Sequence, residues 1–104
     1  MDVHSRHTEG TARIALRGEL DIATAPKLDE AVDRALDDGC REVVVDLAGT
    51  TFMDSQGLGA LIRAARTVDA RRATMAVVSP PGSEARVVIE MSQTGAVVGL
   101  RDDA

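Results

Sequence analysis

The chain has 104 residues, of which 44% are hydrophobic and 28% charged, a balance typical of a globular domain rather than a disordered segment. Its 12 Lys and Arg against 17 Asp and Glu give a formal net charge of −5, which matches nucleic acid or an anionic membrane poorly. Phe52 is the only aromatic residue, so the several stacking rings that single-stranded nucleic acid requires are missing. We expect one domain over residues 1–104, with neither nucleic acid nor membrane as partner.

Three further features of the composition bear on the environment of the chain. Cys40 is the only cysteine, which excludes an internal disulfide; we expect it to pack in the interior, a redox role being the alternative. No apolar run approaches the roughly 18 residues of a membrane helix, and the first four residues, MDVH, lack the pattern of a signal peptide. The expected location is therefore the cytoplasm.

The N-terminal segment predicts a pair of strands. Apolar and polar residues alternate over residues 11–17, which indicates a strand with one buried face. Residues 3–8 are the expected hairpin partner, with Glu9 and Gly10 as the turn, although Val3 is their only large apolar residue.

A helix and a buried strand follow. Thr24 is a suitable N-cap, Pro26 is tolerated in a first helical turn, and Gly39 is a natural stop. Between them, apolar residues recur at helical spacing and form one stripe, made of Leu28, Ala31, Val32, Ala35 and Leu36. Three consecutive valines in residues 42–47 then predict a strand buried on both faces, central in a sheet with helices packed against it.

The second half of the chain continues the alternation of helix and strand. We expect a helix over residues 55–70, a strand over 73–78, a loop over 79–82 and a third helix from Ser83 to about Gly95. This third helix should carry Val87, Val88 and Met91, and residues 96–100 are the expected last strand, before a polar tail. The order ββαβαβαβ predicts an α/β fold, with a mixed, mostly parallel sheet of four to five strands and about three helices.

Familiar catalytic signatures are missing from the sequence. There is no GxxxxGK[ST] loop for phosphates, and the residues around Ser55, MDSQG, do not form a GxSxG elbow. His4 and His7 are the only histidines, two ligands short of a metal site and near the N-terminus. A hydrolase with Ser55 as nucleophile therefore lacks a credible base. We expect no enzyme activity, no metal and no cofactor.

The most informative segment spans residues 43–61, where a buried strand ends, a loop carries Asp54, and a helix begins at or next to Ser55. One interpretation is helix capping by these two residues, with Gly57 and Gly59 only allowing close packing. The other is a phosphorylation site, because an exposed hydroxyl at a helix N-terminus lies beside unpaired N–H groups that favour a phosphate. The added charge of about −1.5 to −2 would change any surface that docks there.

Two motifs extend the second interpretation. The first combines DL at residues 46–47, FMDS at 52–55 and GLG at 57–59; the second is GELD at 18–21, followed by TA at 24–25. Together they resemble the signature of the STAS domain, and more narrowly of the bacterial anti-sigma factor antagonists of the sporulation and general-stress type. The resemblance covers roughly residues 11–100, and the family's element order agrees with the one predicted above.

The resemblance implies a switch. It makes Ser55 the phosphorylated residue, and Asp21, Asp54, Thr24 and Gly57 the residues that support phosphorylation and docking. In such proteins the unphosphorylated antagonist binds an anti-sigma factor that is also a serine kinase, which frees a sigma factor. Phosphorylation from ATP makes the antagonist let go, and a serine phosphatase resets it.

The sequence departs from the family pattern in three places. Gln56 stands where a second Ser or Thr is usual, and SQTGA at residues 92–96 replaces the usual Gly-Leu pair. The C-terminal helix common in the family is expected to be absent or reduced, which would expose part of a sheet face and favour a homodimer or a partner contact. The alternative function is a structural STAS subunit of a lipid-transport or signalling complex, which would not need the Ser55 hydroxyl.

Overall fold

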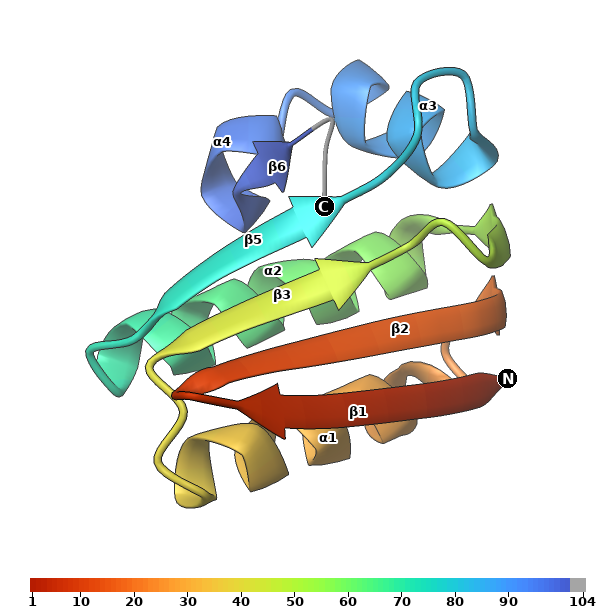
Figure 1. The fold of residues 1–104 in the computed structure, drawn as a ribbon. Coiled ribbons are helices and arrows are strands. Elements are labelled where there is room, and N and C mark those ends of the chain that lie inside the picture. The colour runs from red at the N-terminus through yellow and green to blue at the C-terminus, as the bar shows by residue number, and fades with distance from the viewer. Residues whose placement is uncertain (102–104) are drawn as a thin grey trace.

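A computed structural model describes residues 1–101 of the chain (Figure 1). The strands of this part form one mixed sheet in the order β1-β2-β3-β5-β6, with β4 paired to β2. β1 and β2 are antiparallel, whereas the other pairs are parallel. The strands are β1 Asp2–Thr8, β2 Thr11–Leu20, β3 Glu42–Asp46, β4 Thr50–Met53, β5 Thr74–Val78 and β6 Leu100–Arg101.

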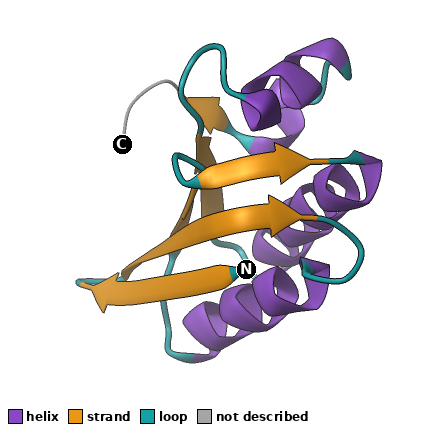
Figure 2. Ribbon diagram, turned by 90° about the vertical axis from the view of Figure 1, so that its right-hand side faces the viewer, coloured by secondary structure: helices purple, strands orange, loops and turns teal. Residues whose placement is uncertain are grey.

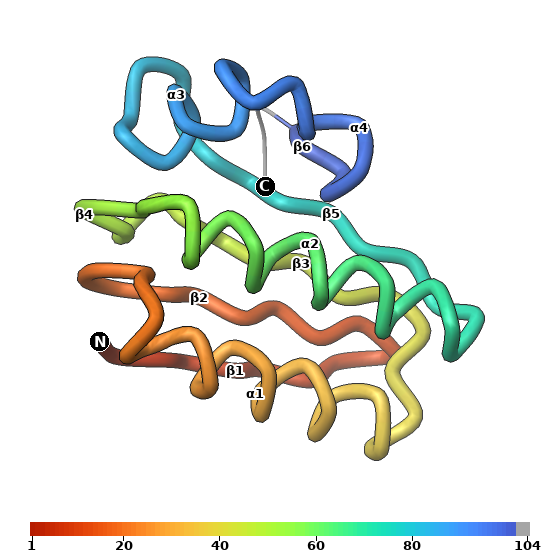
Figure 3. Tube along the Cα trace, turned by 180° about the vertical axis from the view of Figure 1, so that it is seen from behind, coloured from red at the N-terminus to blue at the C-terminus, as the bar shows by residue number. Residues whose placement is uncertain are grey.

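Four helices accompany the sheet in the described residues: α1 Ala25–Asp37, α2 Ser55–Ala70, α3 Glu84–Met91 and α4 Gly95–Val98. α1 and α2 lie side by side on one face of the sheet (Figures 1 and 3). In the part of the chain that the structure describes, the opposite face carries no helix (Figure 2). Over residues 1–101, none of the helices combines the length and apolar character needed to cross a bilayer.

The hairpin at the N-terminus forms as predicted. Glu9 and Gly10 have φ angles of 52° and 82°, the positive values of a two-residue turn that matches the twist of its strands. The register runs without a break from Thr8 opposite Thr11 to Asp2 opposite Arg17. β1 is therefore a complete outer strand, although it contributes only Val3 to the packing against the core.

β3 is central, as its valines predict, but helices cover only one of its faces. Val43 and Val45 are fully buried on the helix side. Val44 is 5% exposed and lies on the helix-free face, where it pairs in register with Arg13. The Arg13 guanidinium donates to Asp46 Oδ2 at 2.9 Å on that same face. The expected burial on both faces is confirmed, although polar side chains rather than a second helix layer accompany Val44.

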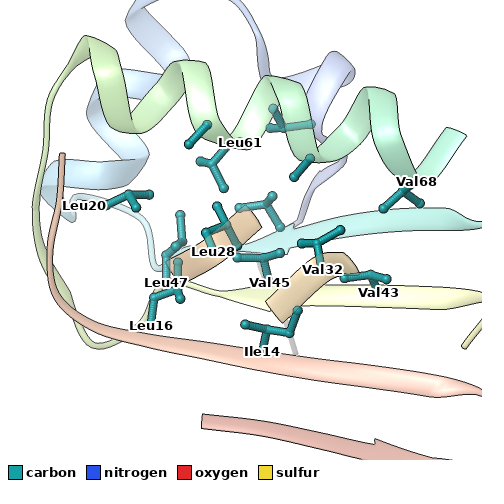
Figure 4. Packing of buried hydrophobic residues seen from close by; sticks show 14 of the residues in the cluster. Ile14, Leu16, Leu20, Leu28, Val32, Val43, Val45, Leu47, Leu61 and Val68 are labelled. Atoms are coloured by element: carbon teal, nitrogen blue, oxygen red, sulfur yellow. The ribbon is translucent and has the colours of Figure 1, made fainter. Parts of the chain in front are cut away.

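The core lies between the sheet and helices α1 and α2 (Figure 4). Its largest fully buried side chains come from all of these elements, among them Ile14, Leu16, Leu28, Val32, Val43, Val45, Leu61 and Val68. Cys40 is 5% exposed and belongs to the same cluster, which confirms its packing role.

Three predictions about elements were wrong. β4 was not expected; it is short and pairs with the end of β2, beside a bulge at Gly18 and Glu19. The expected strand over residues 96–100 is mostly helix α4, and only Leu100 of that range belongs to β6. The third helix ends at Met91, well before Gly95, and the polar tail lies mainly outside the described residues.

The turn after α4 explains the change at the C-terminal end. Gly99 has a φ of 75°, and a Cβ there would lie 2.4 Å from the carbonyl oxygen of Met75. Only glycine fits this close approach. It ends α4 and brings the chain alongside β5, where Val77 N donates to Gly99 O at 2.8 Å.

Candidate functional site at the carboxyl ends of β2 and β4

Two parallel strands bring the predicted site residues to one edge of the sheet. Leu20, the last residue of β2, pairs in register with Met53, the last residue of β4. Asp21 and Asp54 follow these two positions directly, and Asp54 N donates to Leu20 O at 3.4 Å. The turn that opens α1 and the turn that opens α2 therefore stand side by side, which is where α/β sheets commonly carry their sites.

Asp54 caps helix α2. Its extended backbone and its side chain have the geometry of an N-cap, because Oδ1 accepts hydrogen bonds from Gln56 N at 3.0 Å and Gly57 N at 2.9 Å. Two of the N–H groups that a helix start leaves unpaired are thereby satisfied. The capping role belongs to Asp54 rather than to its neighbour.

Ser55 is the first residue of α2 and is exposed. Among the described residues, its hydroxyl makes no side-chain hydrogen bond, and the N-cap position is already occupied by Asp54. The interpretation of Ser55 as a helix cap is therefore wrong. An exposed hydroxyl with no structural task is available to chemistry or to a partner.

Asp21 and Thr24 build the turn between β2 and α1. Asp21 Oδ1 accepts from Ala23 N at 3.0 Å and from Thr24 N at 3.1 Å. The Thr24 hydroxyl donates to Glu19 O at 2.8 Å and accepts from Asp21 N at 3.0 Å. Thr24 occupies the N-cap position of α1, but its side chain makes no capping bond to the helix, so the prediction of a Thr24 cap is wrong. Its hydroxyl instead fixes Asp21.

Gly57 lets α2 approach β2. A Cβ at this position would lie 2.2 Å from Leu20 O and 2.8 Å from Met53 Cγ, far inside van der Waals contact. The prediction of close packing is confirmed for Gly57. It is wrong for Gly59, where the nearest atom to a Cβ would be Arg63 Nη1 at 3.8 Å.

An apolar rim beside the site was not predicted. Ile22, next to Asp21, is 70% exposed, and Phe52 and Val87 are 41% and 42% exposed. The latter two line a shallow groove of about 260 Å³ between β4 and α3. Of the apolar residues expected on the third helix, Val87 and Met91 are exposed, whereas Ala85 and Ile89 are the buried pair. The spacing of these two, one turn apart, was the available signal.

This edge of the sheet combines an exposed hydroxyl, two turn carboxylates and exposed apolar side chains. Over residues 1–101, no three His, Cys, Asp or Glu side chains gather into a group that could hold a metal ion.

The mixed sheet with helices on one face defines the protein as a small α/β domain of mixed-sheet type. The family model described as "Mlab, STAS domain" matches residues 3–100, and the chain belongs to this STAS family. The predicted resemblance is thereby confirmed, together with the α/β fold class.

Several similar proteins and solved structures are named as anti-sigma factor antagonists. The chain is 32% identical over 87 residues to the anti-sigma F factor antagonist of Paenibacillus polymyxa, covering 78% of this chain and 72% of the relative. It is 39% identical over 49 residues to the anti-sigma-B factor antagonist of Staphylococcus aureus, covering 47% of this chain and 45% of that relative. The chain thus spans less than half of the staphylococcal protein in this match.

The fold is also that of the solved anti-sigma factor antagonist SpoIIAA. The unphosphorylated form of that protein superposes with a TM-score of 0.79 at 24% identity, covering 99% of this chain and 88% of SpoIIAA. The phosphorylated form from Bacillus gives a TM-score of 0.74 at 23% identity, with coverage of 99% and 91%. At this level of identity the likeness establishes the fold.

Proposed function

We propose that this chain is an anti-sigma factor antagonist that is switched by phosphorylation of Ser55. Its unphosphorylated form binds an anti-sigma factor with serine kinase activity, and this binding releases a sigma factor in the cytoplasm. The single observation that carries the proposal is the exposed Ser55 hydroxyl at the start of α2, which makes no side-chain hydrogen bond within residues 1–101 and lies next to a cap supplied by Asp54. The names of the relatives support the same role.

The site can accept a phosphoryl group without a change of fold. In the proposed reaction the Ser55 oxygen bonds to the γ-phosphorus of ATP, the bond from that phosphorus to ADP breaks, and the hydroxyl proton is released. The new group stands at a helix N-terminus, where the dipole and the N–H groups favour negative charge. Asp54 keeps its capping bonds, so the helix start does not depend on the serine.

The phosphoryl group would nevertheless weaken docking. It adds a charge of about −1.5 to −2 to an edge that already holds the carboxylates of Asp21 and Asp54. A partner surface that fits the neutral hydroxyl would have to bury this charge unpaired, which is costly. A serine phosphatase would hydrolyse the phosphate ester and restore the binding form.

Four other residues support the switch in this proposal. Asp21 is held by the Thr24 hydroxyl at the end of β2, and it supports phosphoryl transfer and docking from there. Asp54 sets the start of α2, and Gly57 sets its distance from β2. Together they hold Ser55 and the Asp21 turn in a fixed arrangement at one edge of the sheet. A kinase that recognises both features requires such a fixed arrangement.

The proposal treats the chain as a binding protein rather than an enzyme. A structural STAS subunit of a transport or signalling complex is the alternative, and it predicts that the Ser55 hydroxyl is dispensable. We also propose that the chain pairs with a second copy of itself, for which β1 offers the surface described in the next subsection.

Titration of two variants against the cognate anti-sigma kinase, with and without ATP, tests the function. Ser55→Ala should bind the kinase and stay bound in ATP, because no acceptor hydroxyl remains and Gln56 cannot replace it. Ser55→Asp should fold but bind about tenfold to a thousandfold more weakly, because one badly paired charge costs a few kcal/mol. Thr51→Ala, which removes another exposed hydroxyl from β4, is the matched control and should behave like the wild type.

Equal binding by Ser55→Ala and Ser55→Asp, with equal release of wild type and Ser55→Ala by ATP, would contradict the switch. That result would favour the structural subunit instead.

A further inference from the structure

β1 is an outer strand of the sheet. Within the described residues it pairs only with β2, in continuous register over its seven residues. Outer strands are usually protected by bulges, prolines or charged side chains. β1 has no bulge in its pairing and no Pro, and its two charged residues, Asp2 and Arg6, have opposite signs. A groove of about 720 Å³ follows this edge, between β1 and α1.

The turn geometry determines which backbone groups of β1 face outward. A two-residue turn is closed by a hydrogen-bonded pair, here Thr8 and Thr11. Because such pairs alternate along an antiparallel ladder, the backbone groups of Val3, Ser5 and His7 are directed to the free edge. These residues can therefore form a second ladder without disturbing the first.

Two side chains of β1 have opposite charges and different neighbours on β2, where Asp2 stands opposite the cation Arg17. Arg6 is paired in register with Arg13, so its direct neighbour is another cation, which is itself engaged by Asp46 at 2.9 Å. Like charges in opposed positions are unfavourable. Asp2 and Arg6 lie on the same helix-free face of β1, and neither makes a side-chain hydrogen bond or ion pair within residues 1–101.

We propose that β1 pairs antiparallel with β1 of a second copy of this chain. With the twofold axis at His4, Val3 stands opposite Ser5 of the second copy, so that the outward backbone groups pair. In the same register Arg6 stands opposite Asp2 of the second copy, and this charge pair occurs twice. Each Arg6 thereby gains the anion that its own chain does not place opposite it.

The groove beside β1 fits the same occupant. It is lined on the α1 side by Lys27, Glu30 and Arg34. Glu30 and Arg34 pair with each other at 2.9 Å, and Lys27 donates to Met1 O at 3.0 Å, so this wall presents no unpaired charge that would repel a second copy. The six-stranded sheet of one copy would continue into that of the other, with the helices on the same side. β2 lies on the inner side of β1, and β4 pairs with β2, so Ser55 lies off the edge that is proposed to pair.

A charge exchange tests the register. The association of the full chain is measured by sedimentation velocity over a concentration series in low salt, where charge pairs act most strongly. Arg6→Asp places Asp opposite Asp2 of the second copy, twice, and should raise the dimer dissociation constant by at least about tenfold. Its fold should persist, because the new Asp stands opposite Arg13. The double variant Asp2→Arg with Arg6→Asp restores opposite charges between the copies and should recover part of the association, although it also sets a cation opposite Arg17 within each chain.

Thr8→Arg is the matched control, since Thr8 lies on the same face of β1 but beyond the paired residues in this register. It should associate like the wild type. The proposal is overturned if the wild type stays monomeric over the whole series, if Arg6→Asp associates unchanged, or if the double variant fails to recover while its thermal unfolding matches that of Arg6→Asp. Phosphorylation of Ser55 in Arg6→Asp separates a failure of this pairing from a failure of the proposed function.

Discussion

At the scale of single residues, Asp54 and Ser55 are neighbours with separate tasks. Asp54 Oδ1 accepts two helix N–H groups, whereas the Ser55 hydroxyl accepts none. Asp54→Ala should therefore lower the free energy of unfolding by about 1 kcal/mol, within the usual range of about 0.5–2 kcal/mol for a lost cap. Ser55→Ala should change it by less than about 0.5 kcal/mol. Urea unfolding of both variants measures the difference, and equal losses would mean that the serine shares the capping role.

Gly57 and Gly59 offer a matched pair of substitutions. A methyl group at Gly57 would collide with backbone, the carbonyl oxygen of Leu20, which cannot move aside like a flexible side chain. Gly57→Ala should cost about 1–3 kcal/mol or more. Gly59→Ala meets only ordinary contacts and should stabilise the helix by up to about 1 kcal/mol. Thermal unfolding of the two variants measures whether their stabilities change in opposite directions. A Gly57→Ala variant as stable as the wild type would contradict the close approach of α2 to β2.

Asp21 permits a separation of structure from charge. An Asn at this position keeps a carbonyl oxygen to accept from Ala23 N and Thr24 N, but it removes the negative charge. Asp21→Asn should therefore melt close to the wild type while its rate of phosphorylation falls. Asp21→Ala, which loses these bonds as well, should also lose about 1–2 kcal/mol of stability. Phosphorylation of Asp21→Asn at the wild-type rate would remove Asp21 from the proposed switch.

At the scale of elements, β3 shows how two adjacent valines differ. Val45 is fully buried against the helices, and an unpaired carboxylate there would cost several kcal/mol or more, comparable with the whole stability of a typical domain, about 5–15 kcal/mol. Val44 is paired in register with Arg13 on the helix-free face. Val45→Asp should leave the chain unfolded, whereas Val44→Asp should fold with reduced stability, because a cation stands opposite. Circular dichroism of both variants measures whether each is folded. A folded Val45→Asp would contradict the prediction.

The elements that could be predicted from the sequence are those with a strong local pattern. Three patterns each predict an element and its buried face: the alternation in residues 11–17, the three valines of β3 and the apolar stripe of α1. β4 lacks such a pattern, because only Thr50 and Met53 at its ends are buried, and it exists through pairing with β2. The valines of α4 favour a strand by propensity, but the left-handed turn at Gly99 and its contact with β5 decide otherwise.

At the scale of the whole molecule, the candidate site is a product of topology. The motifs predicted roles for Asp21 and Asp54, and the pairing of Leu20 with Met53 brings these two residues to one edge of the sheet. The clash that makes Gly57 necessary depends on the distance between α2 and β2, and the exposure of Phe52 and Val87 depends on how α3 lies over β4. Neither follows from sequence spacing, because each involves segments that are far apart in the chain.

The central claim is that Ser55 is the switched residue, and phosphate mapping tests it most directly. The wild type is incubated with ATP and each candidate anti-sigma kinase that co-purifies with it, and the intact mass and the peptide map are recorded along with retention of the complex. The account predicts one phosphate per chain, located on Ser55, with loss of the complex; Ser55→Ala should gain no phosphate and stay bound. A phosphate on another residue, such as Thr51, or release of Ser55→Ala by ATP as fast as the wild type, would contradict it.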